Sequence, residues 1–263
     1  MLLSAGLTDL TDSMLAIFFP AVCHLCEKPL GDPTDANICG NCRDSIKKIP
    51  EPFCHICGLP VSGLSTREHA PICGRCLSDS PAYGRARCAA LHEDALRDAV
   101  LRFKYGKRMY IAKALAEILF ECFQRHFQVQ GFDLIIPIPI HRKRLRARGF
   151  NQSLLLAHRL SSHTGVRMAR DLLQKTVDTP PQVRLGRKER ITNIKGSFGV
   201  SDPHRITGSK ILLIDDVLTT GATIGAAAQT LKRAKAARVD AMVLAYRRYR
   251  EEEQTRDPEQ FPE

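Results

Sequence analysis

Tryptophan is absent from this chain, and aromatic residues make up only 6% of it. Few stacking platforms are therefore available for a nucleobase or for single-stranded nucleic acid. Acidic residues are also scarce, since 28 Asp and Glu stand against 39 Lys and Arg and leave a formal net charge of +11. A surplus of that size favours a polyanionic partner such as nucleic acid or a polyphosphate, although a basic protein without such a partner is compatible with it.

The first residues contain neither a long apolar run nor a basic start. Leu15–Phe19 is far too short to cross a bilayer. The stretch up to Pro20 carries Asp9 and Asp12 but no Lys or Arg, which a secretory signal needs. We therefore expect residues 1–19 to form an amphipathic helix without membrane insertion, in a cytoplasmic protein.

Cysteine is abundant and clustered. Of the ten cysteines, eight form four CxxC pairs within the first 80 residues: Cys23/Cys26, Cys39/Cys42, Cys54/Cys57 and Cys73/Cys76. A disulfide framework and a metal site are the competing interpretations. Each pair can present two thiolates to one tetrahedral ion, and a reducing compartment disfavours disulfides. We predict a double zinc-ribbon module over residues 20–80 that holds two structural zinc ions.

The grouping of the eight thiolates is open. The simplest arrangement is sequential, with the first two pairs on one ion and the last two on the other, but a crossed arrangement also fits the spacing. His24, His55 and His69 are spare ligands that complete CxxC pairs do not need. Cys122 stands in an apolar pattern that predicts a buried, inert thiol.

After about residue 80 the paired cysteines stop and strand and helix patterns alternate. Apolar periodicity predicts helices over 96–103, 111–123, 151–160 and 225–237, and strands over 133–140, 210–216 and 239–246. Alternating strands and helices indicate an α/β fold with a mainly parallel sheet flanked by helices, which we assign to residues 81–249. Residues 250–263 are polar and aperiodic, and we expect them to be disordered.

The most informative stretch is ILLIDDVLTTGATI, residues 211–224. It reads as a buried strand, a loop of small hydroxyl and glycine residues, and a helix. Ligands of open α/β sheets bind at the carboxyl ends of strands, where a helix N-terminus attracts anions. Thr219, Thr220 and Thr223 add hydroxyl donors, and Gly221 lets the backbone approach a phosphate. The loop therefore predicts a monophosphate site.

Two adjacent carboxylates, Asp215 and Asp216, precede this loop. Ribose hydroxyls and Mg²⁺ are good partners for carboxylates, so phosphate and ribose recognition side by side indicates a 5-phosphoribosyl ligand. A strand with an acidic helix cap is the plainer alternative, and a Walker A loop fits poorly because no GK[ST] ends the loop. Strand alternation means that one Asp alone can face the ligand fully.

DDVLTTGAT resembles the motif of type I phosphoribosyltransferases. The segments HRKRLRARGFNQS and RKERITNIKGSF, with a cysteine-rich ribbon ahead of FKYGKR, resemble the ComF/GntX-like family over roughly residues 20–248. The resemblance implies a type I phosphoribosyltransferase fold behind the zinc ribbon. It also implies that the protein binds phosphoribosyl pyrophosphate with Mg²⁺, and that Asp215 and Asp216 bind the ribose hydroxyls of this ligand. Val217–Thr223, including Ala222, would then surround its 5-phosphate.

Three basic clusters are available for the pyrophosphate, and each can equally be a solvated basic face. They are Lys104, Lys107 and Arg108; Arg142, Lys143, Arg144, Arg146 and Arg148; and Arg184, Arg187, Lys188 and Arg190. The last cluster resembles the mobile catalytic loop of phosphoribosyltransferases, which makes Arg187 and Lys188 candidate catalytic residues beside the two aspartates. Lys104 and Arg142 are the candidate binding residues from the other clusters.

Two functions follow from the resemblance. Members of the family are linked to natural competence and to the handling of incoming single-stranded DNA, alongside an inferred phosphoribosyltransferase activity. One hypothesis is therefore a phosphoribosyltransferase with an unknown acceptor. The other is a non-catalytic single-stranded DNA-binding factor that keeps the phosphoribosyl-binding fold. Other competence or DNA-processing proteins are partners that the resemblance suggests.

Overall fold

The computed structural model describes residues 21–30, 38–61, 71–106, 108–178, 194 and 196–248. The expected helix over 1–19 and the tail over 250–263 lie outside these residues. Within the described ranges, no helix is both long and apolar enough to cross a membrane.

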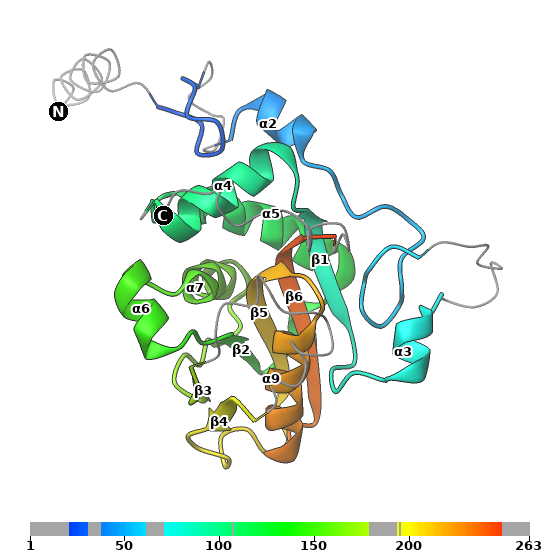
Figure 1. Ribbon diagram of the computed structural model, residues 1–263. Helices are drawn as coiled ribbons and strands as arrows, with labels where there is room; N and C mark the ends of the chain where they lie inside the picture. Colours follow the sequence, from blue (N-terminus) through cyan, green and yellow to red (C-terminus); the bar gives the residue numbers. More distant parts are fainter. Residues whose placement is uncertain are drawn as a thin grey trace, which may run out of the picture.

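A parallel sheet in the strand order β1-β6-β5-β2 forms the centre of the molecule (Figure 1). Its strands are β1 (Ala86–Leu91), β6 (Arg238–Tyr246), β5 (Lys210–Leu218) and β2 (Leu134–Pro137). β5 and β6 pair from Lys210 opposite Arg238 to Leu218 opposite Tyr246. Sheets buried on both faces have strands that are apolar throughout, which is why KILLIDDVL and RVDAMVLAY were recognisable as strands.

Helices cover both faces of the sheet. α4 (Asp94–Tyr105), α5 (Ile111–His126) and α7 (Gln152–Thr164) share a hydrophobic core with Leu212 and Ile214 of β5. α9 (Ala222–Arg233) shares the second core with Ile211 and Leu213 of β5. These two residues alternate along the strand with Leu212 and Ile214, so they face the opposite side of the sheet. Figure 1 shows α9 in front of the strands, α5 at their upper ends and α4 above α5.

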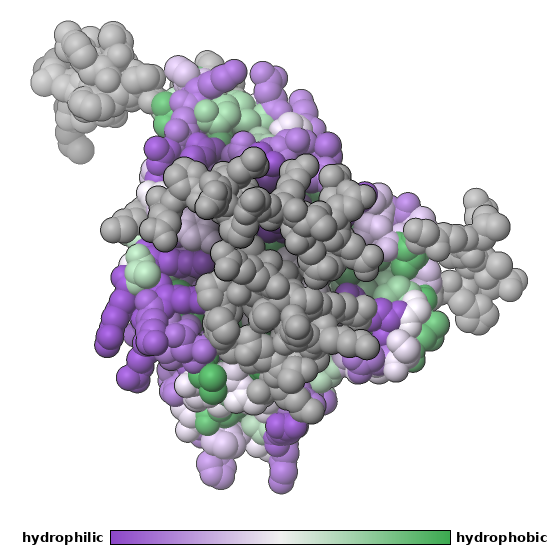
Figure 2. All heavy atoms as spheres, viewed as in Figure 1, coloured by the Kyte–Doolittle hydropathy of each residue, from purple (hydrophilic) through white to green (hydrophobic). Residues whose placement is uncertain are grey.

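Smaller elements complete the domain. They are the 3₁₀ turn η1 (Val129–Gly131), α6 (Arg142–Arg148) and the antiparallel pair β3 (Leu173–Lys175) and β4 (Phe198–Val200). α6 is basic along its length and none of its residues is buried. Hydrophilic side chains gather on this side of the molecule in Figure 2.

The two cysteine modules divide between the two cores. The first contains α2 (Gly40–Ser45), and its Cys23 and Cys42 belong to the core of α4 and α5. The second contains α3 (Gly74–Ser78), and its Cys57 and Cys76 belong to the core of α9. The segment between them also runs along edge strand β1, since the N–H of Leu91 donates to Lys47 O at 2.7 Å. The ribbons are therefore built into the domain, and they cover a sheet edge that would otherwise be exposed.

The helices and strands predicted after residue 80 are all found in the structure, with shifted ends. The last predicted helix begins at Ala222 and ends at Arg233, instead of spanning 225–237. β1 was not predicted, because its sequence ARCAAL combines Ala, which is depleted in strands, with a charged residue. The sequence also did not predict α6 or the β3–β4 pair.

Candidate functional site

The loop between β5 and α9 has the geometry of an anion cradle. Gly221 is the N-cap of α9 with φ +81°, a conformation that glycine adopts without strain. The Thr220 hydroxyl accepts a hydrogen bond from the Ala222 N–H at 3.4 Å. The first amides of a helix have no acceptor within the helix, so those at the start of α9 can serve a phosphate.

Asp215 stands just before this loop and turns towards α7. Its Oδ1 accepts hydrogen bonds from the Ser153 hydroxyl at 3.0 Å and from the Asp216 N–H at 2.9 Å. Burial, and then the neighbouring charge of Asp216, raise the pKa of Asp215 to about 7. Near neutral pH this carboxyl group is therefore poised between its neutral and ionised forms.

Asp216 turns towards α4 instead. Its Oδ1 lies 3.0 Å from Nζ of Lys104, and both side chains are largely removed from solvent. The alternation expected for adjacent strand residues thus gives each aspartate a different partner. Lys104, a candidate from sequence, is brought to the acidic pair. Ser153 was not singled out from the sequence, where it follows the RGFNQ motif without any sign of its contact.

His92 is a further neighbour that the sequence did not reveal. Burial, and then the charges of Lys104 and Arg247, lower the pKa of His92 to about 4, against the opposing effect of Asp216. The imidazole is therefore neutral at physiological pH. It can offer a hydrogen bond to a ligand, but it adds no positive charge to the site.

A basic cavity of about 190 Å³ opens next to Lys104. The other residues that line it are Tyr105, Arg144, Ala147 and Arg148. Arg148 lies over the Tyr105 ring at 5.3 Å, and its Nη1 donates to Gln152 Oε1 at 3.4 Å. The cavity therefore joins cations from two of the clusters predicted from sequence, and none of the described residues that line it is acidic.

Hydrogen bonds explain how the RGFNQ segment, residues 148–152, is held in place. Asn151 caps α7 by accepting from the Ser153 N–H at 3.1 Å, and its amide donates to Ile138 O at 3.0 Å. Gly149 ends α6 with φ +83°. Because Gln152 holds Arg148, the segment fixes both α7 and the guanidinium group at the cavity.

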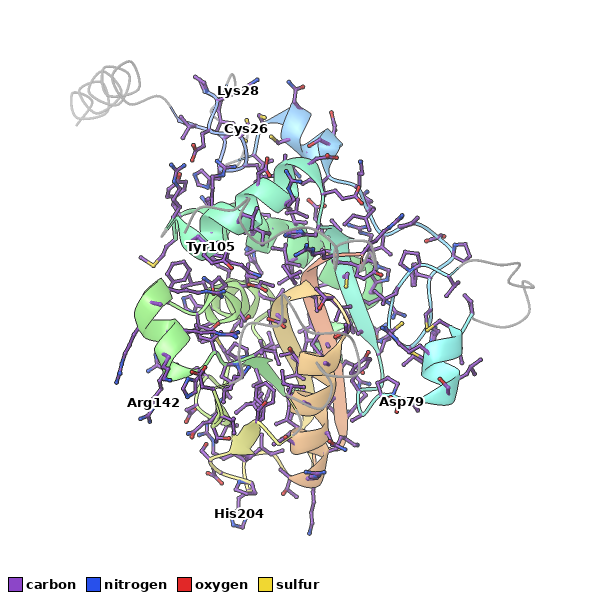
Figure 3. All side chains as sticks on the ribbon, in the orientation of Figure 1. Cys26, Lys28, Asp79, Tyr105, Arg142 and His204 are labelled. Atoms are coloured by element: carbon purple, nitrogen blue, oxygen red, sulfur yellow. The ribbon has the colours of Figure 1, made fainter. Side chains whose placement is uncertain are left out.

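The remaining basic candidates fall elsewhere. Arg108 pairs with Glu27 of the first ribbon, so it does not lie beside Lys104, with which the sequence had grouped it. Arg142, the first residue of α6, is exposed and does not line the cavity; Figure 3 shows it at the end of α6 remote from Tyr105. Arg187 and Lys188 lie outside the described residues, together with Lys107, Arg184 and Arg190.

The eight paired cysteines form two groups of four sulfur atoms. The groups are Cys23, Cys26, Cys39 and Cys42, and Cys54, Cys57, Cys73 and Cys76, with all sulfurs of a group within 4.8 Å of one another. The arrangement is sequential, not crossed. Sulfurs bound about 2.3 Å from one tetrahedral zinc lie roughly 3.8 Å apart. The Cys26–Cys39 and Cys57–Cys73 sulfur pairs, at 3.8 and 3.7 Å, match that distance.

Backbone amides support one sulfur in each group. Burial opposes ionisation of Cys23, but N–H groups of Cys26, Cys39 and Leu25 outweigh it and lower its pKa to about 7. Cys54 has the same environment and a pKa of about 7, with burial again opposing the effect of backbone N–H groups. Such amides stabilise the thiolate that binds metal. Two complete thiolate sets therefore fit two structural zinc ions.

The remaining thiols and the histidines stay outside the two groups. Among the described residues, no histidine belongs to either group. His24 packs edge-on against Tyr110, His55 is exposed, and His69 lies outside the described residues. Cys122 is buried as predicted, and burial raises its pKa to about 11.

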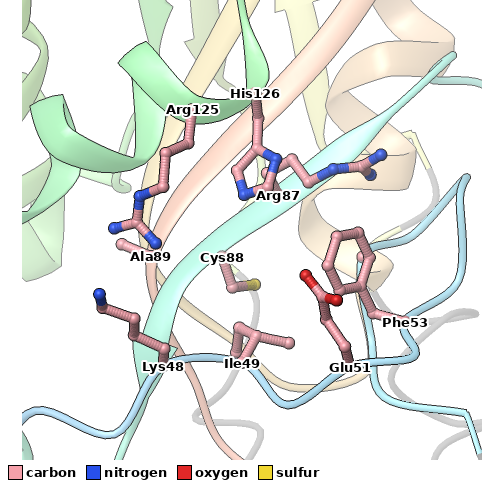
Figure 4. Close-up of a pocket in the computed structure, with 10 residues that line it drawn as sticks. Lys48, Ile49, Glu51, Phe53, Arg87, Cys88, Ala89, Arg125 and His126 are labelled. Carbon is pink, nitrogen blue, oxygen red and sulfur yellow. The ribbon is translucent and has the colours of Figure 1, made fainter.

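A second cavity, of about 140 Å³, lies between the inter-ribbon segment, β1 and the end of α5 (Figure 4). Its main cations have structural partners: Arg87 donates to His55 O at 3.0 Å, and Arg125 donates to Glu121 O at 3.2 Å. This cavity is a seam between the ribbons and the sheet, and neither Asp215 nor Asp216 is among the residues that line it.

The fold and the site define a class of protein in which a double zinc ribbon is joined to a phosphoribosyltransferase-type domain. Residues 14–77 match the family model of the double zinc ribbon domain, and residues 151–260 match that of the phosphoribosyl transferase domain.

Named relatives cover most of the chain. DNA utilization protein YhgH of Escherichia coli is 33% identical, over 86% of this chain and 96% of its own length. Competence protein ComFC of Bacillus subtilis is 29% identical over 80% and 84% of the two chains. For competence protein F of Haemophilus influenzae the identity is 27%, over 74% and 84%. The chain therefore belongs to the ComF/GntX-like family that its motifs resemble.

Proposed function

We propose that this protein binds phosphoribosyl pyrophosphate with Mg²⁺ at the carboxyl end of β5 and transfers its phosphoribosyl group to an acceptor. One observation carries the proposal. Asp215 and Asp216 stand directly before the helix-capping loop of α9, so carboxylates and a phosphate cradle lie side by side. A ligand with adjacent hydroxyl and phosphate groups satisfies both parts.

Each part of the ligand has its own set of residues. The ribose hydroxyls would be held by Asp215 and Asp216, and the 5-phosphate by Val217–Thr223. The pyrophosphate would enter the cavity beside Lys104, where Arg144 and Arg148 add positive charge. Arg187 and Lys188 are proposed from the family motif to close over it.

The proposed reaction breaks the bond between the anomeric carbon and the pyrophosphate oxygen, and forms one between that carbon and the acceptor, which gives up a proton. Positive charge develops on the ribose and negative charge on the departing pyrophosphate. Cations aimed at the departing group lower the barrier because they are already in place. Mg²⁺, held through ligand oxygens and the aspartates, would neutralise further negative charge.

The biological setting is proposed from the relatives. They carry the names DNA utilization protein and competence protein, so we place the activity in the handling of incoming DNA. A specific observation favours a second function, the binding of single-stranded DNA. Tyr105 is 69% exposed beside Arg148 and the basic helix α6, a combination that suits base stacking next to phosphate contacts.

Calorimetric titration with phosphoribosyl pyrophosphate and Mg²⁺ tests the first proposal. We expect the wild type to bind, and the double variant Asp215→Ala/Asp216→Ala to lose binding. A matched control, Asp44→Ala/Asp98→Ala, removes two exposed carboxylates from α2 and α4 and should bind as the wild type does. No binding by the wild type would overturn the ligand assignment.

A further inference from the structure

An arginine of the second ribbon contacts the phosphate loop. Arg75 lies in α3, between the ligand cysteines Cys73 and Cys76, and its Nη1 donates a hydrogen bond to the carbonyl oxygen of Thr220 at 3.2 Å. The two residues are far apart in sequence. This contact therefore links one metal module directly to the loop that we propose to hold the 5-phosphate.

The surrounding packing makes the link continuous. Cys57 and Cys76 share one hydrophobic core with Leu218, at the end of β5, and with Ile224 in the first turn of α9. The Tyr83 hydroxyl of the same core lies 3.7 Å from the position that a Cβ on Gly221 would occupy. The second ribbon thus belongs to the same hydrophobic core as the residues at both ends of the loop.

The chain itself ties Arg75 to the second cysteine site, because Cys73 is the N-cap of α3 and Cys76 follows Arg75 directly. Four thiolates around one Zn²⁺ leave a net charge of −2. A zinc-loaded site would therefore attract the guanidinium group of Arg75, because guanidinium groups interact most strongly with charged partners.

Orientation of the Thr220 carbonyl matters for the anion site. The peptide bond is planar and trans, so the Gly221 N–H points opposite to the Thr220 C=O. A peptide that precedes a glycine in the left-handed region can rotate readily, because glycine tolerates many backbone conformations. By fixing the carbonyl, Arg75 also fixes the direction of the Gly221 N–H at the mouth of the loop.

We infer that Arg75 is a positioning residue through which the metal-bearing second ribbon sets the orientation of the Thr220–Gly221 peptide, and with it the affinity of the loop for a phosphate monoester. The inference rests on the proposed function for its ligand. It gives the zinc ribbon a role besides folding, because the ribbon then orients a peptide group of the proposed phosphate site.

The first ribbon provides a matched control. Arg43 occupies the corresponding short helix α2, but its Nη1 pairs with Glu121 of α5 at 3.1 Å, on the other core of the protein. Arg43→Ala removes an arginine from the short helix of the other ribbon. It leaves the phosphate loop untouched.

The experiment compares wild type, Arg75→Ala, Arg75→Lys and Arg43→Ala as full-length, zinc-loaded protein. Three quantities are measured for each: zinc content, affinity for ribose 5-phosphate by calorimetry, and hydrogen exchange of the 217–224 segment. We expect Arg75→Ala to keep its zinc, to bind ribose 5-phosphate about tenfold more weakly and to exchange faster in that segment. Arg75→Lys should recover part of the affinity, and Arg43→Ala should match the wild type.

The outcomes separate the two proposals. If the wild type does not bind ribose 5-phosphate, the proposed function fails, while the exchange rates still report on the contact between Arg75 and the loop. If Arg75→Ala matches the wild type in both affinity and exchange, the inference fails and the proposed function stands. Loss of zinc from Arg75→Ala would also overturn the inference, since the arginine would then serve the metal site alone.

Discussion

Lys104 of α4 and Asp216 of β5 form an ion pair, with 3.0 Å between Nζ and Oδ1, at the carboxyl edge of the sheet. The pair lies between the two parts of the candidate site. On one side is the loop with the phosphate cradle, and on the other is the basic cavity that Lys104 lines. An arriving pyrophosphate would offer Lys104 a second anionic partner, while a ribose hydroxyl would offer one to Asp216. One member of the pair would therefore bind the pyrophosphate of the proposed ligand, and the other would bind its ribose.

Lys104→Ala should weaken pyrophosphate binding more than ribose 5-phosphate binding. The variant removes a cation from the cavity, and a charge-assisted hydrogen bond is worth about tenfold in affinity. Calorimetric titration with each ligand in the presence of Mg²⁺ gives the comparison. Arg142→Ala is the matched control, because Arg142 is exposed on α6 and outside the cavity lining. An equal loss for both ligands in Lys104→Ala would refute the separate roles.

Asp215→Asn should stabilise the unliganded protein at pH 8 but not at pH 4. Burial and Asp216 raise the pKa of Asp215 to about 7, above its ordinary value. The folded state therefore holds this proton more tightly than the unfolded state does. This tighter proton binding adds to the free energy of unfolding at low pH, and its contribution is lost as the pH rises through about 7. Asparagine is never ionised, and its oxygen can still accept from Ser153.

Thermal unfolding followed at several pH values provides the measurement. We expect the Tm of Asp215→Asn to exceed that of the wild type by roughly 3–6 °C at pH 8, with the difference vanishing towards pH 4. Asp133→Asn, which replaces an exposed aspartate at the opposite end of the same sheet, is the control variant. A constant Tm difference across the pH range would contradict the environment described for Asp215.

Local sequence patterns predicted the parts of the fold and site that depend on near neighbours. Long apolar runs specified β5 and β6, and four CxxC pairs specified two thiolate sets, because spacing alone decides whether two sulfurs can reach one ion. The loop from Asp215 to Thr223 was recognisable for the same reason. Its strand, acidic pair, small residues and helix are consecutive in the chain.

Contacts between distant segments could not be predicted. Lys104, Ser153 and Arg75 come from three different helices, and nothing near each residue indicates its partner in β5 or the following loop. The basic clusters illustrate the same limit. Lys104 and Arg108 are close in sequence, yet one reaches Asp216 and the other reaches Glu27, because the chain turns between α4 and α5.

Metal analysis of two double variants tests the sequential grouping of the cysteines. The wild type should contain about two zinc ions per chain. Cys23→Ser/Cys39→Ser removes ligands from one group and should retain one ion, whereas Cys23→Ser/Cys54→Ser damages both groups and should lose both. A crossed arrangement would give the reverse result. Lower stability is expected in every case, because structural zinc contributes to the folding free energy.

Single-stranded DNA binding, if it uses α6 and Tyr105, should depend on salt in a defined way. Each phosphate contact contributes about −0.7 to the slope of log affinity against log salt. Arg142→Ala/Arg146→Ala removes two exposed cations of α6 and should reduce the magnitude of the slope by about 1.4. Tyr105→Ala should lower the affinity and leave the slope unchanged, because stacking releases no counterions. A slope near zero for the wild type would eliminate this interface.

Two glycine substitutions at the start of α9 should have opposite effects on stability. Gly221 has φ +81°, so Gly221→Ala forces an L-residue into the left-handed region and should cost about 1–2 kcal/mol. Space is not the obstacle, since the nearest atom to the new Cβ would be the Tyr83 hydroxyl oxygen at 3.7 Å. Gly225 lies inside the helix, and apart from its own helical backbone no atom of the described residues lies within 4 Å of the position that an added methyl group would occupy. Gly225→Ala should therefore stabilise the protein by about 0.5–1 kcal/mol. Urea denaturation measures both changes, and the same sign for the two variants would contradict the loop conformation on which the proposed phosphate site depends.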